Sequence, residues 1–262
     1  MNDRHGDVTV TIDEDRIATV EIHRPPDNFF DIDLIQSLAD VYEELDSQDD
    51  CRAVVLCSEG KHFCAGADFT GRSRAVAVSS GREGAGRLYQ EAARLFEAKT
   101  PVVAAVQGAA VGGGLGLACS ADFRVTCPTA RFSANFARLG FHHGFGLTVT
   151  LPAIVGGQHA LDLLLTGRRI SGEDAQRIGL CDRMVDAAGL RAAAHELAAE
   201  IGQSAPLAVR SIRETMRAGL ADKVRAATDR ELEEQDRLRT TSDWSEGVQA
   251  AAERRPPRFE GR

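Results

Sequence analysis

The sequence predicts an α/β fold with a large core and a C-terminal helical region, and three observations lead to this prediction. Continuous apolar runs, AVVLC at 53–57 and PVVAAV at 101–106, are typical of strands buried on both faces of a sheet. Glycine-rich loops and helical segments follow these runs. From Leu190 onward the pattern is almost wholly helical. We therefore assign residues 1–200 to the α/β core and residues 201–262 to the helical region.

The N-terminal segment alternates between apolar and polar residues. VTVTID at 8–13 and RIATVEI at 16–22 flank a polar turn, which predicts a β-hairpin with one buried face. RPPDN at 24–28 then interrupts the sheet. Apolar residues recur at helical spacing beyond this turn, and either Asp31 or Asp33 can cap the predicted helix.

The middle of the chain continues the alternation of helices and strands. A helix is expected from about Arg87 to Ala98, and DFRVTC at 122–127 reads as a further strand. In SGEDAQRIG, Ser171 is placed as a helix N-cap with Asp174 three residues later. These elements keep the α/β pattern through the first two thirds of the sequence.

Composition excludes several classes of function. The formal net charge of −8 and the pI of about 5.4 argue against nucleic acid or an anionic membrane as the main partner. No stretch of about 18 uninterrupted apolar residues occurs, and the N-terminus has no pattern of a signal peptide. Six cysteines lie in apolar contexts without C-x-x-C spacing, so we expect reduced thiols in a cytoplasmic protein that has no metal centre.

Two loops of small residues carry the strongest functional signal. CAGAD at 64–68 and VGGGLGLAC at 111–119 each follow an apolar strand. The second loop lacks the dinucleotide-binding spacing, because Cys119 stands where a third glycine would be needed. Two such loops on parallel strands can direct two backbone N–H groups at one oxyanion. The alternative is that the glycines only allow close packing of a strand against a helix.

The two loops give the chain a resemblance to a known family. HFCAGADF at 62–69, followed by KTPVVAAVQGAAVGGGLGLACSAD at 99–122, resembles the crotonase superfamily of enoyl-CoA hydratases and isomerases. LLLTGRRISGEDAQRIGLCDRMV at 163–185 falls in the same order. The resemblance implies a spiral of ββα units whose C-terminal helices build a homotrimer or a dimer of trimers. It also implies an acyl-CoA substrate and no separate cofactor.

The resemblance also implies site residues. The oxyanion donors would be the N–H groups of Ala67 and Gly113, which are the first two candidate catalytic residues. The acyl-CoA would contact both loops and the segment after the second, at Ala65, Gly66, Ala67, Asp68, Phe69, Gly112, Gly113, Gly116 and Phe136. In the family, backbone groups rather than side chains contact most of the CoA.

The chain departs from the family at the two hydratase glutamates. Gly116 stands where the first glutamate belongs, and Phe136 stands in place of the second. Neither residue can transfer a proton, so we do not expect ordinary hydration by a glutamate pair. His142 and His143 remain as candidate bases, because a histidine has a reference pKa near 6.5. The alternative is a pair of turn histidines bonded to nearby backbone.

Two functions therefore stay open from the sequence. The first is an enzyme that forms a thioester enolate and uses a histidine base, for isomerisation or for hydrolytic cleavage of a carbon-carbon bond in a β-keto acyl-CoA. The second is a CoA-thioester-binding or assembly subunit without catalysis. Glu83, Tyr89 and Glu91 could also reach the pocket, but an ordinary solvated surface position is favoured for each.

Overall fold

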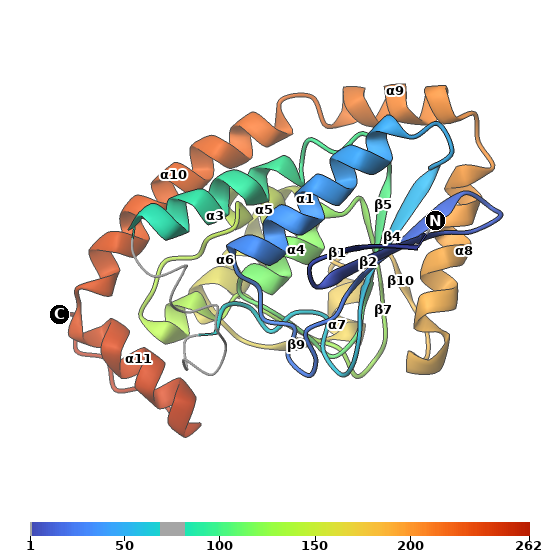
Figure 1. The fold of residues 1–262 in the computed structure, drawn as a ribbon. Coiled ribbons are helices and arrows are strands. Elements are labelled where there is room, and N and C mark those ends of the chain that lie inside the picture. Colours follow the sequence, from blue (N-terminus) through green and yellow to red (C-terminus); the bar gives the residue numbers. More distant parts are fainter. Residues whose placement is uncertain (1, 69–81) are drawn as a thin grey trace.

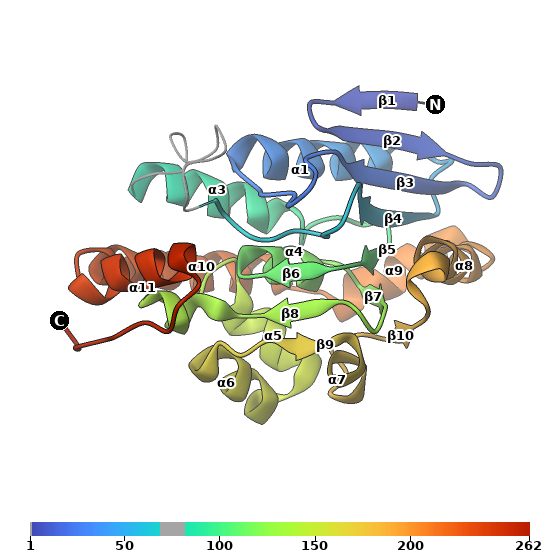
Figure 2. The same cartoon turned by 90° about the horizontal axis from the view of Figure 1, so that it is seen from below.

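The computed structural model describes residues 2–68 and 82–262 of the chain. Within these residues the strands form a seven-stranded sheet, ordered β1-β2-β3-β4-β5-β7-β10, and a three-stranded sheet, ordered β6-β8-β9. The strands are β1 Asn2–His5, β2 Val8–Ile12, β3 Ile17–Ile22, β4 Ala53–Ser58, β5 Val102–Val106, β6 Ala109–Val111, β7 Phe123–Thr126, β8 Arg131–Ser133, β9 Ile170–Ser171 and β10 Arg183–Met184. Figure 2 shows the strands of the smaller sheet side by side.

Helices lie on both faces of the larger sheet (Figure 1). The helices are α1 Ile32–Ser47, α3 Arg82–Arg94, α4 Gly113–Ser120, α5 Leu147–Val155, α6 Gly157–Thr166, α7 Gly172–Arg177, α8 Leu190–Gly202, α9 Pro206–Met216, α10 Leu220–Arg239 and α11 Ser242–Glu253, with the short 3-10 helices η1 Asn135–Leu139 and η2 Ala187–Gly189. Of these, α1 and α4 lie on one side of the larger sheet and α8 lies on the other. The predicted α/β fold with a helical C-terminal region is confirmed. The domain boundary and the role of the last helices in a trimer stay predictions.

The local predictions hold with small differences. Strands β2 and β3 pair antiparallel, as the alternating pattern predicts, and β1 adds an edge strand that was not predicted because its sequence is polar. Asp31 caps α1 by accepting a hydrogen bond from the Leu34 N–H at 2.9 Å. Ser171 caps α7 in the same way, through the Asp174 N–H at 3.1 Å. Helix α3 begins at Arg82, earlier than predicted.

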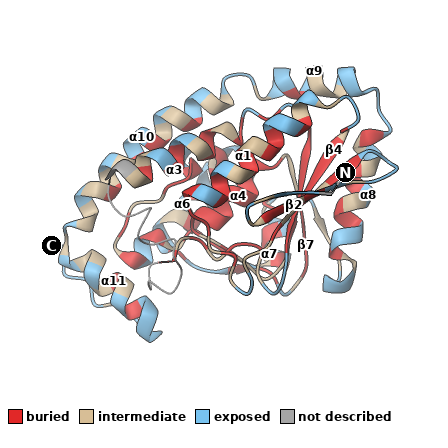
Figure 3. Ribbon diagram, in the orientation of Figure 1, coloured by how far each residue is buried: buried red, intermediate tan, exposed pale blue. Residues whose placement is uncertain are grey.

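The parallel centre of the large sheet is buried on both faces, as Figure 3 shows. In β4, Val54 and Leu56 belong to the larger hydrophobic cluster, which also includes residues of α1 and α4. Ala53 and Val55 face the other way, into a smaller cluster with α8. Because successive side chains of a strand alternate between faces, a continuous apolar run supplies both clusters.

The C-terminal helices pack on the core rather than extending away from it. Helix α10 contacts α3 and α5, and α11 contacts η1. Figure 1 shows α10 running beside α3, with the C-terminus far from the N-terminal strands. This packing brings residues after position 220 to the same part of the molecule as the loops that follow β4 and β6.

The cysteines and the longest helices bear on two further expectations. All six cysteines are buried and free, in agreement with the prediction of reduced thiols. In the described part of the chain, none of the helices combines the length and the apolar character needed to cross a bilayer.

Candidate functional site

The two small-residue loops meet at one cavity of about 350 Å³. Backbone hydrogen bonds hold them side by side: Cys64 N–H donates to the Ala109 carbonyl at 2.9 Å, and Val111 N–H donates to the Cys64 carbonyl at 3.1 Å. The first loop therefore continues past β6 before reaching Ala67, and the second enters α4 at Gly113. The backbone itself fixes how the two loops lie relative to each other.

The small residues of these loops are required by close packing. Gly66 has a φ of +95°, and a Cβ there would lie 2.8 Å from the Val111 carbonyl oxygen. A Cβ on Gly113 would lie 2.4 Å from Cζ of Phe30. Real Cβ atoms do not approach other atoms this closely, so larger residues would force the loops apart.

The N–H groups of Ala67 and Gly113 are available at this cavity. Both residues line it. Gly113 is the first residue of α4, so its N–H has no partner within the helix. Within the described residues, neither N–H forms a backbone hydrogen bond. The site thus offers two main-chain donors from different loops, one of them at a helix N-terminus, where partial positive charge favours an anion.

Most of the predicted binding residues line the cavity, and one does not. Those on its wall are Ala65, Gly66, Ala67, Asp68, Gly112, Gly113 and Phe136. Gly116 lies in the buried face of α4, away from the cavity wall, and a Cβ there would lie 2.6 Å from Cβ of Phe145. Its expected contact with the substrate is therefore replaced by packing against Phe145. Phe69 lies outside the described residues.

Aromatic side chains form much of the remaining wall. Phe145 has a φ of +62° and packs edge to face with Phe30, at 5.5 Å between ring centroids. The ring of Phe136, a residue that the resemblance aligns with the second glutamate, lies 6.4 Å from the ring of Phe141 between centroids. Positive φ is uncommon for a bulky residue, so tertiary packing must hold Phe145 in place. The wall accordingly suits an apolar acyl chain.

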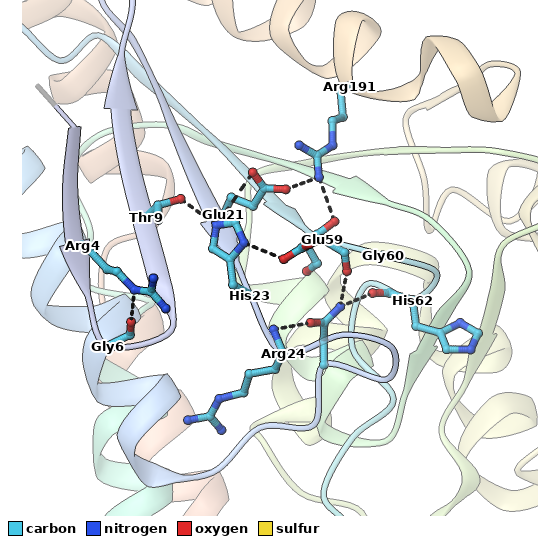
Figure 4. A network of polar contacts seen from close by, with 12 residues as sticks. Arg4, Gly6, Thr9, Glu21, His23, Arg24, Glu59, Gly60, His62 and Arg191 are labelled. Carbon is cyan, nitrogen blue, oxygen red and sulfur yellow. Dashed lines mark hydrogen bonds and ion pairs between the residues drawn. The ribbon is translucent and has the colours of Figure 1, made fainter.

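A polar network supports the segment that carries Phe29 and Phe30 to the cavity. Asn28 is fully buried and accepts from the Arg24 N–H at 2.9 Å, while its amide donates to the carbonyls of Glu59 at 2.8 Å and His62 at 2.6 Å. Figure 4 shows this network, in which His23 lies between Thr9 and Glu59. The segment is thus held by side-chain hydrogen bonds where it leaves the sheet.

The two candidate histidines lie next to the cavity, but their rings are not part of its wall. Gly144 and Phe145 line the cavity, and His142 and His143 do not. The rings stack on each other at 4.1 Å, and His142 Nδ1 lies 2.8 Å from the His143 carbonyl oxygen. The structure therefore resembles the alternative in which the turn histidines bond to nearby groups.

His143 belongs to a relay that ends at a buried carboxylate. Its Nε2 lies 2.8 Å from Thr148 Oγ1, which donates to Glu231 Oε1 at 2.6 Å. Because the threonine proton is directed at the carboxylate, the threonine oxygen accepts from His143, and this assigns the proton of the neutral ring to Nε2. Burial, with a smaller effect of His142, lowers the pKa of His143 to about 4. The ring is therefore neutral at pH 7.

This low pKa predicts a pH dependence of stability. In the unfolded chain His143 has a pKa near 6.5, so between about pH 4 and pH 6.5 the unfolded state binds more protons than the folded state. The free energy of unfolding should rise by about 3 kcal/mol across this window and then level off. Urea titrations of the native chain and of His143→Gln at several pH values test this. An equal pH dependence in both proteins would contradict the assignment.

Helix α10 contributes three residues that sequence reasoning missed. Glu231, fully buried, accepts from the N–H groups of Gly146 at 2.9 Å and Thr148 at 3.0 Å, and burial raises its pKa. Gln235 and Arg239 line the cavity. The three residues recur every four positions on one helix face. This spacing is the only feature of the sequence that groups the three residues. It does not single them out, because many other charged residues of the same helix show helical spacing too.

Tyr89 also differs from its predicted surface position. It is nearly buried and lines the cavity, where its hydroxyl donates to Gln235 Oε1 at 2.9 Å. Gln235 in turn donates to the carbonyls of His142 at 3.1 Å and His143 at 3.2 Å. Burial raises the pKa of Tyr89 far above its ordinary value, so the phenol stays protonated. Tyr89 and Gln235 thus fasten the histidine turn to α3 and α10.

Among the described residues, a group of carboxylate and imidazole side chains, which are types that can bind a metal ion, lies away from this cavity. Asp13, Asp15 and His195 bring one ligand atom each within 4.8 Å of one another, near the β2-β3 turn and α8. His195 and Asp13 form an ion pair, which accounts for the proximity without a metal. These residues do not line the cavity of the two loops.

Known proteins resemble this chain over nearly its whole length. Residues 13–262 match the model of a family described as enoyl-CoA hydratase/isomerase. A short-chain-enoyl-CoA hydratase from Clostridium acetobutylicum is 33% identical over 245 residues, which cover 92% of this chain and 93% of that protein. A carnitinyl-CoA dehydratase from Proteus mirabilis is 30% identical over 251 residues, covering 94% and 95%. The crystal structure of an enoyl-CoA hydratase/isomerase from Pseudoalteromonas atlantica superposes with a TM-score of 0.82 at 29% identity, covering 97% of this chain and 100% of that one.

Proposed function

Because the chain belongs to the enoyl-CoA hydratase/isomerase family, we propose that it binds an acyl-CoA and stabilises the enolate of its thioester between the N–H groups of Ala67 and Gly113. One observation supports this proposal: the two loops are hydrogen-bonded side by side, and Ala67 and Gly113 both line the same cavity. Donors that are fixed before the reaction stabilise the charge that develops on the carbonyl oxygen.

The proposed chemistry uses one acid-base group rather than a glutamate pair. Gly116 and Phe136 stand where the resemblance places the two glutamates, and Phe145 leaves no space for a side chain at position 116. One base can remove the α-proton of a β,γ-unsaturated thioester and return the proton to the γ-carbon, which moves the double bond into conjugation with the carbonyl and is an isomerisation. It can also activate water for carbon-carbon cleavage of a β-keto acyl-CoA. We favour these two reactions over hydration.

We assign the proton transfer to Asp68 rather than to His142 or His143. A general base must come within hydrogen-bond reach of the proton that it removes. Asp68 follows the donor Ala67 directly and lines the cavity. The neutral His143 ring instead bonds to Thr148, outside the cavity wall. Among the described residues on that wall, Asp68 is the sole carboxylate.

Exchange of the α-proton in deuterated water tests the function and its base together. Butyryl-CoA and pentanoyl-CoA, whose α-protons exchange very slowly without a catalyst, are incubated with the native chain, and incorporation of deuterium at the α-carbon is followed by NMR. We expect exchange with the native chain and a loss of at least about a hundredfold with Asp68→Asn, because general bases typically contribute that much. His142→Gln and His143→Gln should retain activity within a few fold. Loss with either histidine variant, and not with Asp68→Asn, would return the base to that histidine.

The second candidate function is a CoA-thioester-binding or assembly subunit without catalysis. The absence of both glutamates favours it. A subunit without catalysis should still bind the same acyl-CoAs, which calorimetry can measure. The bound acyl-CoAs should then be recovered without deuterium. Binding without exchange would therefore replace the enzymatic proposal.

A further inference from the structure

Arg239 is a cation on the cavity wall whose observed partner is aromatic. Its guanidinium carbon lies 5.1 Å from the ring centroid of Phe141. No carboxylate among the described residues forms an ion pair with it. The other arginines of α10 differ: Arg225 pairs with Asp222 at 3.0 Å, Arg230 with Glu233 at 3.2 Å and Arg237 with Glu234 at 2.6 Å. Arg239 is thus the α10 arginine that lines the cavity and has no ion pair among the described residues.

The hydrogen bonds that the Arg239 guanidinium can donate are not all formed within the described residues. Its Nε is buried and has no hydrogen-bond partner in the described part of the chain. A buried donor without a partner costs free energy, and native structures rarely keep one without a reason. Stacking on Phe141 occupies a face of the guanidinium, whereas hydrogen bonds leave from its edge. The edge offers paired N–H groups that match a carboxylate.

Within the described residues, the neighbouring polar side chains form no hydrogen bond or ion pair with the Arg239 guanidinium. Gln235, one turn earlier on α10, accepts from Tyr89 and donates to the carbonyls of His142 and His143. Two other charged residues line the cavity, Asp68 and Arg254, and Arg254 is exposed at the end of α11. Arg239 and Arg254 together outweigh Asp68, so the cavity has a net positive charge among its described lining residues.

We propose that the acyl group of the substrate carries a carboxylate and that Arg239 binds it. The substrate class is then the monothioester of a dicarboxylic acid with CoA. This inference rests on the proposed function, because it places the thioester carbonyl at Ala67 and Gly113. The aromatic and aliphatic wall contacts the carbon chain between the two ends. An anionic group could also come from a CoA phosphate, and the two sources predict different behaviour of an Arg239 variant.

Paired ligands that differ only in the carboxylate test the proposal. Calorimetry gives the dissociation constant of each ligand. Succinyl-CoA is compared with butyryl-CoA, and glutaryl-CoA is compared with pentanoyl-CoA. Free CoA is measured as well. We expect the native chain to bind each carboxylated ligand about tenfold or more tightly than its partner. Arg239→Gln should remove this preference, because it should weaken each carboxylated ligand about tenfold or more relative to its uncharged partner. Arg239→Lys should keep part of it, because lysine retains the charge but not the paired donors.

Arg237→Gln is the matched control, since Arg237 lies on the same helix but pairs with Glu234 and does not line the cavity. It should preserve the preference. Equal weakening of all ligands and of free CoA by Arg239→Gln would assign Arg239 to a CoA phosphate and overturn the proposal. Equal affinities within each pair for the native chain would also overturn it. Failure to bind any acyl-CoA would instead contradict the proposed function on which it rests.

Discussion

Ala67→Pro should slow α-proton exchange by about a hundred- to a thousandfold, because proline has no N–H to donate to the enolate oxygen. Losing one oxyanion donor typically costs this much in rate. The donor comes from the main chain, so only a residue without an N–H can remove it. Affinity for the ground-state thioester should fall much less, since the donor acts mainly on the charge that develops during the reaction. Exchange rates and calorimetric affinities measured on the same preparation separate the two effects.

Ala67→Ser is the control, because it keeps the N–H and adds one polar atom at a residue that is only partly buried. It should retain exchange within about tenfold. The circular dichroism spectrum and melting temperature of both variants establish that the fold is intact. Native-like exchange by a folded Ala67→Pro protein would place the oxyanion elsewhere.

Glu231→Ala should lower the free energy of unfolding by about 3 to 5 kcal/mol. The carboxylate is fully buried and accepts the N–H groups of Gly146 and Thr148 and the hydroxyl of Thr148. Its removal leaves three donors without an acceptor inside the protein. The same turn carries Gly144 and Phe145 into the cavity wall, so acyl-CoA affinity should fall together with stability.

Glu233→Ala provides the comparison for Glu231→Ala in urea titrations. Glu233 lies on the same helix, has a side chain 58% exposed and pairs with Arg230 at 3.2 Å. Exposed pairs of this kind contribute less than about 1 kcal/mol. Similar losses in the two variants would mean that helix content, rather than the buried acceptor, sets the effect.

Local patterns were sufficient for most of the fold. The alternation in residues 8–22 predicted the β2-β3 hairpin, and the apolar run at 53–57 predicted a strand buried on both faces. Ser171 caps its helix as predicted. Each of these features depends on residues that are neighbours in sequence, so its signal can be read from a short window.

The part of the candidate site that the backbone forms could be predicted from the sequence. The side chains that complete the cavity wall could not. The two loops could be found because close packing demands small residues at fixed spacing, as at Gly66 and Gly113. The histidine turn could be found too, but its sequence does not tell which way the rings point. Their position outside the cavity wall follows from bonds to Thr148 and to the turn itself.

The sequence by itself thus determined the α/β fold and the family resemblance, and it predicted the two backbone donors at Ala67 and Gly113. Only the tertiary structure placed Tyr89, Gln235 and Arg239 on the cavity wall and left the histidine rings outside it. The physical reason is the range of the interactions. A helix in the last quarter of the chain packs against α3 and α5. Its helical spacing can be read from the local sequence, but the partners that it meets are set by long-range contacts that the local sequence does not specify.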